Sequence, residues 1–385
     1  MSTAFANSIL DDRNPILFSQ LKTEDRFVQG AVQFLDRTVT SNAGLCAFLS
    51  SGSTGIPKII VHSVSSLKKS ALKIVERYPE ISGKRFHHFF PSNYMAGVLN
   101  CTLIPLLSGG SIFLDDQFNF SSPFTTPVRA KEFKAKVAWL SPSMLASINI
   151  QASKGRGSFP EWEVVLAATG PLTTSARDQV LEFSKSKIYN TFGTTESLFV
   201  STELEIRKQV DCGSPLSNVS ARIMSEDGTL CAAGSGALYV KSDTVAKYIF
   251  QGFETVGGGF DFSEIPVSQD SYAPTGDAAT IQNNRIQIEG RNDDIVVLGG
   301  LNISLARVES VAREFPQVIE VCAYARFGGT IADLSLYYEA SDVDLFSERL
   351  FHEFLVEKLG MDDVPRKLFR RNLPRTPSGK VDRMQ

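Results

Sequence analysis

A nine-residue segment, Ser50-Ser51-Gly52-Ser53-Thr54-Gly55-Ile56-Pro57-Lys58, combines hydroxyl groups, glycines and a lysine. Glycines let backbone N–H groups crowd around an anion, and the hydroxyls and the ammonium add donors suited to a polyphosphate. A Walker A loop ends in Gly-Lys-Ser/Thr and opens a helix, whereas here Pro57 precedes the lysine and an apolar, strand-like run follows. Taken alone, this segment fits a polar surface hairpin better than a phosphate site.

Four further segments carry residues that could do chemistry. Phe192-Gly193-Thr194-Thr195-Glu196 places a hydroxyl beside a carboxylate, which a phosphate-bound Mg²⁺ requires. Thr275-Gly276-Asp277 offers a carboxylate able to accept hydrogen bonds from two ribose hydroxyls. The other two are Gly290-Arg291-Asn292-Asp293-Asp294 and, in an Arg-rich tail, Pro377-Ser378-Gly379-Lys380. Taken singly, the last three segments also fit a turn, a solvated linker and a solvated basic face.

Strands and helices alternate through the first half of the chain. The sequence predicts strands at 45–49, 59–61, 86–90, 111–114, 137–140, 163–169 and 187–190. It predicts helices at 63–78, 95–107, 142–150 and 172–184, the first with Ser63 or Ser65 as its N-cap. This alternation is typical of βαβ units, so we expect a largely parallel sheet covered by helices.

The pattern changes in the second half. Short strands separated by Gly, Asp, Ser and Asn turns predict a β-rich subdomain over 200–288. Strands at 318–325 and 334–340 and an amphipathic segment at 343–359 then predict a compact α+β unit. With a boundary at about 291–294, we expect an α/β fold made of a large N-terminal domain of stacked α/β layers (1–290) and a small α+β C-terminal domain (291–385).

Composition excludes several classes of protein. The 385 residues are roughly two to three typical domain lengths. Lys and Arg total 39 against 42 Asp and Glu, so there is no excess of positive charge to neutralise nucleic acid. No apolar run approaches the ~20 residues that span a bilayer, and the N-terminus does not resemble a signal peptide. The five scattered cysteines fit a reducing cytosol, which predicts a cytoplasmic protein, and the four histidines do not suggest a His-rich metal centre.

Together, in this order and at these spacings, the five motifs resemble those of the adenylate-forming superfamily. This superfamily includes acyl-CoA synthetases, aryl-CoA ligases, peptide-synthetase adenylation domains and luciferases. The resemblance covers about residues 45–383 and rests on SSGSTGIPK, FGTTE, TGD, GRNDD with the following GGLNI, and PRTPSGKVDR. The short N-terminal region is nearest to the o-succinylbenzoate–CoA ligase type. The members use ATP and Mg²⁺, and their small C-terminal domain is mobile.

The resemblance implies roles for individual nucleotide-binding residues. A mobile loop over the ATP phosphates would be formed by Ser51, Gly52, Ser53, Thr54, Gly55 and Lys58. Phe192 would stack on or beside adenine, and the opposite wall would be the backbone of Ala168, Thr169 and Gly170. Asp277 would bind the ribose hydroxyls, with Arg291 nearby. Further cofactor-binding positions would be Asn190, Thr191, Gly193 and Thr194.

The catalytic roles follow from the same resemblance. Thr195 would contact the α-phosphate, Glu196 would hold Mg²⁺, and Lys380 would bridge the acid's carboxylate and the α-phosphate. Asp293 would be the hinge about which the C-terminal domain rotates between two half-reactions. The first joins the acid to AMP with release of pyrophosphate. The second transfers the acyl group to the thiol of CoA, or alternatively to the phosphopantetheine of an acyl carrier protein.

The chain departs from the family pattern near the expected acid pocket. Tyr94 stands where the o-succinylbenzoate–CoA ligase type has an aromatic-flanked histidine, and Gly97 follows it. Family members also usually carry ~100 or more residues before the phosphate loop, against about 50 here, so the first subdomain should be small. We expect an aromatic or medium-chain acid. A third alternative is a non-catalytic paralogue that binds nucleotide or acyl-adenylate, although the presence of both Glu196 and Lys380 speaks against it.

Overall fold

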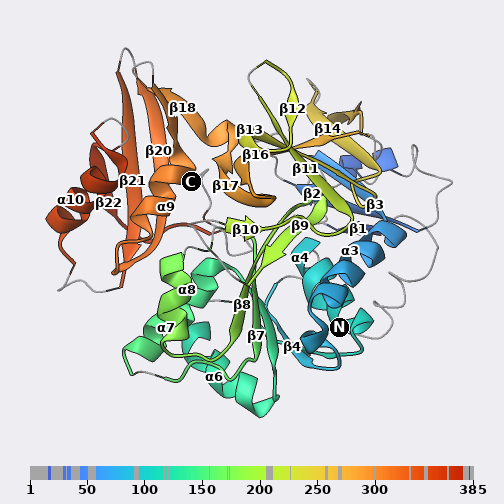
Figure 1. Cartoon of the computed structure of the whole chain (residues 1–385), viewed down its shortest axis with the longest axis horizontal. Helices are drawn as coiled ribbons and strands as arrows, with labels where there is room; N and C mark the ends of the chain where they lie inside the picture. The colour runs from blue at the N-terminus through green and yellow to red at the C-terminus, as the bar shows by residue number, and fades with distance from the viewer. Residues whose placement is uncertain are drawn as a thin grey trace.

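The structure is a computed structural model that describes most of the chain. The described residues are 16–18, 29–31, 33–35, 44–50, 58–90, 95–116, 118, 121–155, 157–170, 172, 174–204, 211–225, 227–255, 259–267, 271–298, 301–328, 331–341, 346–361, 364–375 and 381, side chains excepted at a few of them. Sheets and helices form stacked layers, and the C-terminal elements lie at one side (Figure 1). The α/β fold class predicted from the sequence is confirmed.

A six-stranded sheet runs through the lower part of the molecule in Figure 1, in the order β5-β4-β6-β7-β8-β9. Its strands are β4 Arg85–His88, β5 Ser111–Leu114, β6 Val137–Leu140, β7 Val164–Ala167, β8 Lys187–Thr194 and β9 Leu198–Glu203. The first five strands of this order are parallel, and β9 is antiparallel to β8. The carboxyl ends of the parallel strands therefore lie along one edge, where α/β sheets bind ligands.

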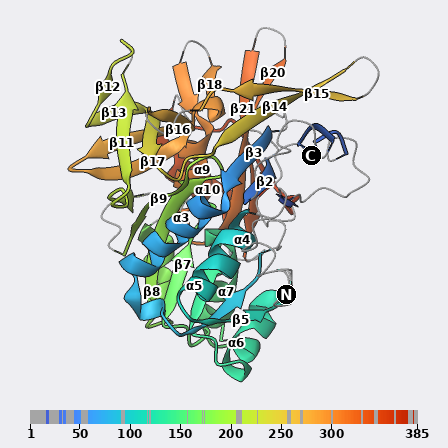
Figure 2. The ribbon, with the colours of Figure 1, turned by 90° about the vertical axis from the view of Figure 1, so that its right-hand side faces the viewer.

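Helices cover both faces of this sheet (Figures 1 and 2). One face carries α3 Val64–Arg77, the 3-10 turn η1 Pro79–Ile81, α4 Met95–Val98, the π-helical turn η2 Leu99–Leu103 and α5 Ile104–Leu107. The other face carries α6 Ser122–Glu132, α7 Pro142–Ser153 and α8 Thr174–Leu181. As predicted, Ser63 caps α3, and its hydroxyl accepts a hydrogen bond from the Ser66 N–H at 3.0 Å.

A second sheet has the order β1-β2-β3-β14-β15. Its strands are β1 Ile16–Phe18, β2 Leu45–Ser50, β3 Lys58–Ser63, β14 Tyr248–Glu254 and β15 Phe260–Ile265. β2 and β3 pair in antiparallel register on either side of residues 51–57. The region 200–288 is β-rich as predicted, but its strands β14 and β15 pair with β3 and with each other.

The remaining strands of that region form an antiparallel sheet in the order β10-β17-β16-β13-β11-β12. They are β10 Asp211–Gly213, β11 Val219–Met224, β12 Leu230–Cys231, β13 Gly234–Ser242, β16 Ala273–Gln282 and β17 Arg285–Arg291. Val200 of β9 belongs to the hydrophobic cluster of this sheet. The antiparallel sheet thus packs against the end of the parallel sheet.

The C-terminal elements build a separate hydrophobic core around Phe351 and Leu336. They are η3 Asn292–Asp294, β18 Ile295–Leu298, β19 Leu301–Ser304, α9 Leu305–Ala312, β20 Val318–Gly328, β21 Ile331–Ala340, α10 Glu348–Leu359 and β22 Lys367–Arg370. Lys154, the C-cap of α7, donates a hydrogen bond to the carbonyl oxygen of Ser341 at 2.9 Å. This contact links the C-terminal unit to the helices of the parallel sheet. The division into two domains stays a prediction.

Candidate active site

The FGTTE motif forms the turn between β8 and β9. The Thr194 hydroxyl accepts a hydrogen bond from the Ser197 N–H at 3.1 Å, which closes the turn and leaves Thr195 and Glu196 at its tip. A bulge at Phe192–Gly193 precedes the tip, and Leu198 follows it with φ of +61°. A Cβ on Gly193 would collide with the Leu198 carbonyl oxygen. Glycine is therefore required at 193 for the two strands to approach so closely.

The backbone of this turn is fixed from outside the motif. His62 of β3 donates from Nε2 to the carbonyl oxygen of Thr195 at 2.7 Å, since a carbonyl can only accept. The Ala246 N–H donates to the carbonyl oxygen of Glu196 at 2.7 Å. His62 is fully buried, and burial lowers its pKa to about 4. The ring is therefore neutral at pH 7 and holds the turn as a donor. Sequence reasoning missed His62, because no motif includes it.

Asp277 and Arg291 lie opposite each other on the paired strands β16 and β17. Arg291 Nη1 lies 3.3 Å from Asp277 Oδ1 and donates to the Thr275 carbonyl oxygen at 3.1 Å. Gly276 has φ of +79°, and a Cβ there would approach Arg291 Nη2 to 2.5 Å. The TGD motif therefore needs glycine at 276 for its backbone conformation, and any larger residue there would also displace the guanidinium from Asp277.

One carboxylate oxygen of Asp277 is buried without a partner in the described part of the chain. The residue is 5% exposed, and its Oδ2 atom has no hydrogen-bond partner among the described residues. Burial raises the pKa of Asp277 to about 6; Arg291 opposes this effect, and the negative charge of Glu196 adds to it. An unpartnered buried carboxylate oxygen calls for a donor, and a pair of ribose hydroxyls would supply one.

The segment after β7 contributes strained backbone at the same edge of the sheet. Thr169 has φ of +71°, which is unusual for a β-branched residue and is often associated with a functional site. Its hydroxyl is buried and, within the described part of the chain, has no hydrogen-bond partner. The Ala168 N–H donates to the Leu140 carbonyl oxygen at 3.0 Å, and Gly170 faces Pro142 at the start of α7. These contacts fix the backbone that was expected to wall the adenine.

Three predicted cofactor-binding side chains contact the protein itself. Asn190 Nδ2 donates to the Asp211 carbonyl oxygen at 3.0 Å, and the Thr191 hydroxyl lies 3.0 Å from that of Thr202. Phe192 is half-buried and packs on the core of the antiparallel sheet. These side chains hold β8 against its neighbours. The predicted stacking of Phe192 on adenine stays a prediction.

Several other predicted residues fall outside the described ones. They are Ser51, Gly52, Ser53, Thr54 and Gly55 of the phosphate loop, Tyr94 and Lys380, together with the side chain of Asp293. Two neighbours of these segments are described. Lys58 begins β3 opposite Ser50, and Gly97 is buried in α4, where its carbonyl oxygen accepts from the Thr102 hydroxyl at 2.8 Å. The predicted loop therefore starts and ends on two adjacent strands.

The described residues do not form a ready-made metal cage. Within them, no group of three His, Cys, Asp or Glu side chains could hold a metal ion. Mg²⁺ in nucleotide sites is usually held by one or two carboxylates together with phosphate oxygens, and Glu196 at the tip of the turn fits that arrangement. In the same part of the chain, none of the helices combines the length and the apolar character that crossing a membrane requires.

Comparison with known sequences decides the family. The model of the AMP-binding enzyme family matches residues 7–250, well over half of the chain. The chain belongs to the AMP-binding enzymes. Its curated relatives include the p-hydroxybenzoic acid–AMP ligase FadD22 of Mycobacterium tuberculosis (25% identical; 88% of this chain, 47% of the relative). They also include the D-alanine–D-alanyl carrier protein ligase of Bacillus licheniformis (25% identical; 86% of this chain, 68% of the relative).

Solved structures have the same fold. O-succinylbenzoate coenzyme A synthetase (MenE) from Bacillus subtilis, in complex with AMP, matches with a TM-score of 0.69 at 21% identity, over 87% of this chain and 67% of that one. The anthranilate CoA ligase AuaEII, in complex with anthranoyl-AMP, matches with a TM-score of 0.71 at 18% identity, over 87% of this chain and 65% of that one. This AMP-binding enzyme spans about half of FadD22 and 13% of a longer relative, the naringenin synthase of Pestalotiopsis fici.

Proposed function

We propose that this AMP-binding enzyme activates a carboxylic acid as its acyl-adenylate and then transfers the acyl group to a thiol. In the first half-reaction, a carboxylate oxygen attacks the α-phosphorus of ATP. The bond from that phosphorus to the bridging oxygen breaks, and pyrophosphate leaves. In the second half-reaction, a thiol attacks the acyl carbon of the mixed anhydride, forms the thioester and releases AMP with the thiol proton.

The observation that carries this proposal is the pairing of Asp277 with Arg291 across strands β16 and β17, which leaves one buried carboxylate oxygen without a partner among the described residues. Asp277 presents an unpartnered, buried oxygen, which suits the ribose hydroxyls. Glu196 lies on a turn whose backbone His62 holds, which suits the phosphate end of the nucleotide. The negative charge of Glu196 also helps to raise the pKa of Asp277, which supports the assignment of both groups to one nucleotide site. A nucleotide spanning from one to the other would satisfy both.

The residues of the chain would act mainly by neutralising charge and by positioning. Two anions, the carboxylate and the triphosphate, must meet, so fixed positive charge and donors aimed at the α-phosphate lower the barrier most. Lys380 would supply a cation there, and Thr195 would contact the α-phosphate. Mg²⁺, when bound beside Glu196, would add positive charge at the phosphates. Arg291, already beside Asp277, would lie next to the ribose.

The acceptor thiol is the finer part of the proposal. The relatives of this chain include a carrier-protein ligase, and its structural neighbours include the anthranilate CoA ligase AuaEII. We favour CoA, with a carrier-protein phosphopantetheine as the alternative. Incubating the enzyme, ATP and its best acid with either CoA or a phosphopantetheinylated carrier protein separates the two. Thioester on CoA alone supports the first acceptor, and thioester on the carrier alone supports the second.

Acid-dependent ATP–pyrophosphate exchange, run over a panel of aromatic and medium-chain acids, tests the adenylation itself. We expect at least one acid to support exchange that requires Mg²⁺, and we expect Asp277→Ala to need a higher ATP concentration to reach the same rate. Exchange with none of the acids, by a protein that still binds ATP, would contradict the proposal and favour a nucleotide-binding paralogue. This assay reports the acid without assuming any acceptor.

A further inference from the structure

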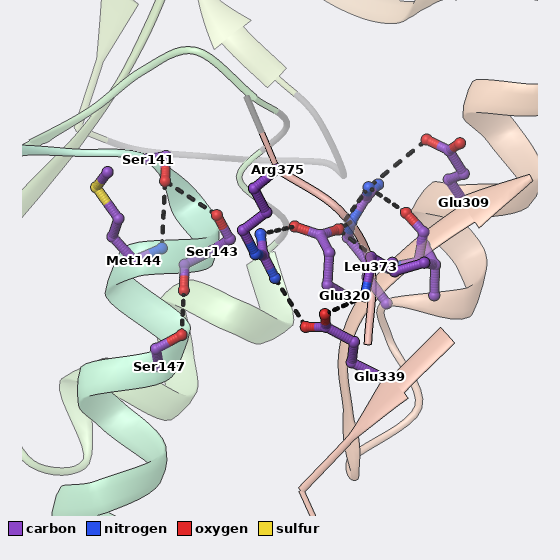
Figure 3. Close-up of polar contacts among 11 residues, drawn as sticks. Ser141, Ser143, Met144, Ser147, Glu309, Glu320, Glu339, Leu373 and Arg375 are labelled. Carbon is purple, nitrogen blue, oxygen red and sulfur yellow. Dashed lines mark hydrogen bonds and ion pairs between the residues drawn. The ribbon is translucent and has the colours of Figure 1, made fainter. Parts of the chain in front are cut away.

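A single carboxylate anchors the C-terminal segment that leads to Lys380. Glu339 of β21 accepts the Leu373 N–H on Oε1 at 2.6 Å, and its Oε2 lies 2.7 Å from Arg375 Nη2 (Figure 3). Both oxygens of Glu339 therefore bind the same segment, once through its backbone and once through a side chain. Charge-assisted hydrogen bonds of this kind are about twice as strong as neutral ones.

The position of Arg375 is explained by the strands beneath it. Glu320 of β20 lies directly opposite Glu339 of β21 in the antiparallel register. Two carboxylates at paired positions repel each other, and Glu320 is itself buried. Arg375 Nη1 lies 3.7 Å from Glu320 Oε2, and Arg313 lies 2.8 Å from Oε1 of the same carboxylate. Arg375 thus bridges two acidic side chains that need a cation between them.

The same arginine also pairs with Val381, the residue after Lys380. Arg375 and Val381 form an isolated antiparallel β-bridge. Residues 376–380 lie between these partners and outside the described part of the chain, and Lys380 directly precedes Val381. The bridge therefore joins Arg375 to the residue that directly follows Lys380 in the sequence.

The anchor also faces the edge of the candidate site. Figure 3 shows Arg375 between the first turn of α7, with Ser141 and Ser143, and the two glutamates. Ser141 caps α7, and the next residue, Pro142, is the one that Gly170 faces at the expected adenine wall. The anchor therefore lies on the side of the C-terminal unit that is turned toward the parallel sheet.

We propose that Arg375 is a positioning residue for adenylation: clamped by Glu339 and Glu320, it holds Val381 and thereby helps to position Lys380, the residue before it, for the α-phosphate. The inference rests on the proposed function, in which Lys380 serves the first half-reaction. In this role Arg375 acts through Val381 and binds neither ATP nor the acid. Its effect should therefore appear in the rate of adenylation and not in the affinity for ATP.

Two measurements on the full-length protein test this role. Arg375→Ala should lower the kcat of acid-dependent pyrophosphate exchange about tenfold to a hundredfold, since small misplacements of a catalytic group cost up to this much. The KM for ATP and the rate of thioester formation from preformed acyl-adenylate should stay near the wild-type values. Amide hydrogen exchange in residues 371–381 should become faster. Arg349→Ala, which removes an exposed arginine of α10, is the matched control.

A double-mutant cycle checks the clamp. Glu339→Gln alone should lower the kcat of pyrophosphate exchange in the same way. Adding Arg375→Ala to Glu339→Gln should lower kcat far less than it does in wild type, because the two residues act through one contact. Arg375→Lys should recover part of the rate. Unchanged amide exchange in Arg375→Ala, fully additive effects, or an equal loss in both half-reactions would overturn the inference. If none of the tested acids supported pyrophosphate exchange by the wild-type enzyme, the proposed function itself would be contradicted.

Discussion

His62 and Thr195 lie 133 residues apart in sequence, and a 2.7 Å hydrogen bond from the buried imidazole to the Thr195 carbonyl oxygen joins them. The bond connects β3, the strand that follows the predicted phosphate loop, to the turn that carries Thr195 and Glu196. The ring of a fully buried histidine with a pKa lowered to about 4 is a neutral donor at pH 7. The turn that carries Thr195 and Glu196 is therefore attached to the strand that begins at Lys58, the last residue of the predicted phosphate loop.

Replacing His62 should loosen that turn. His62→Leu leaves a carbonyl without its donor, and an unpaired buried group of this kind costs about 1–3 kcal/mol. We expect acid-dependent pyrophosphate exchange to fall at least tenfold in a folded protein, whereas His62→Gln, which keeps an N–H donor, retains more of the rate. Exposed His352→Leu serves as the control. Equal rates for His62→Leu and wild type would show that the bond does not position the turn.

Asp277 should determine nucleotide affinity. Asp277→Ala removes the acceptor for the ribose hydroxyls, and hydrogen bonds to a charged group contribute about 1.5–3 kcal/mol. We predict ATP affinity weakened at least tenfold, with the fold retained, in a calorimetric or fluorescence titration. Asp261→Ala, at an exposed position of β15, should bind like wild type. An unchanged titration in folded Asp277→Ala would remove this residue from the site.

Asp277 should also make stability depend on pH. Burial raises its pKa from an ordinary 3.8 to about 6, so between these values the folded protein binds more protons than the unfolded chain. The free energy of unfolding then falls as pH rises through this window, by about 3 kcal/mol from this group. Asp277→Asn lacks the ionisation. In the absence of ligand, urea unfolding should show that the free energy of unfolding of Asp277→Asn rises relative to that of wild type by about 3 kcal/mol between pH 3.5 and pH 7. A difference that stays constant over this range would contradict the raised pKa.

Local sequence signals predicted much of the fold. The regular spacing of apolar residues and the Ser63 cap located α3, and short apolar runs located the parallel strands. The helix predicted at 95–107 is divided by the π-helical turn η2. Such a turn could not be predicted, because its wider spacing of hydrogen bonds barely changes the pattern of apolar residues. Helix α6 was not predicted, since it contains Pro127 and a first half rich in Ser and Thr. The pairing of β14 with β3 depends on a long-range contact that no local signal carries.

The candidate site, like the fold, could be predicted from the sequence only in part. The motif resemblance indicated Asp277, Arg291 and Glu196, and the antiparallel pairing of β16 with β17 explains why the first two meet. The bond from His62 could not be predicted, because its partner is a backbone atom on a distant strand. The Glu320–Glu339 pair was hidden for a related reason: register across a hairpin cannot be read from charge alone. The motifs therefore identify the candidate site residues, whereas the contacts that position them depend on long-range pairing that the motifs do not reveal.

The central claim is that Lys380 joins a carboxylate to the α-phosphate of ATP at the site formed by Glu196 and Asp277. The most direct test is acid-dependent pyrophosphate exchange by wild type and Lys380→Ala, with exposed Lys358→Ala as control, beside thioester formation from preformed acyl-adenylate. We predict that Lys380→Ala loses exchange by ~100-fold or more, the scale of removing one preorganised donor from a transition state, and that it still forms thioester at a near-normal rate. Full retention of exchange by Lys380→Ala would contradict the account.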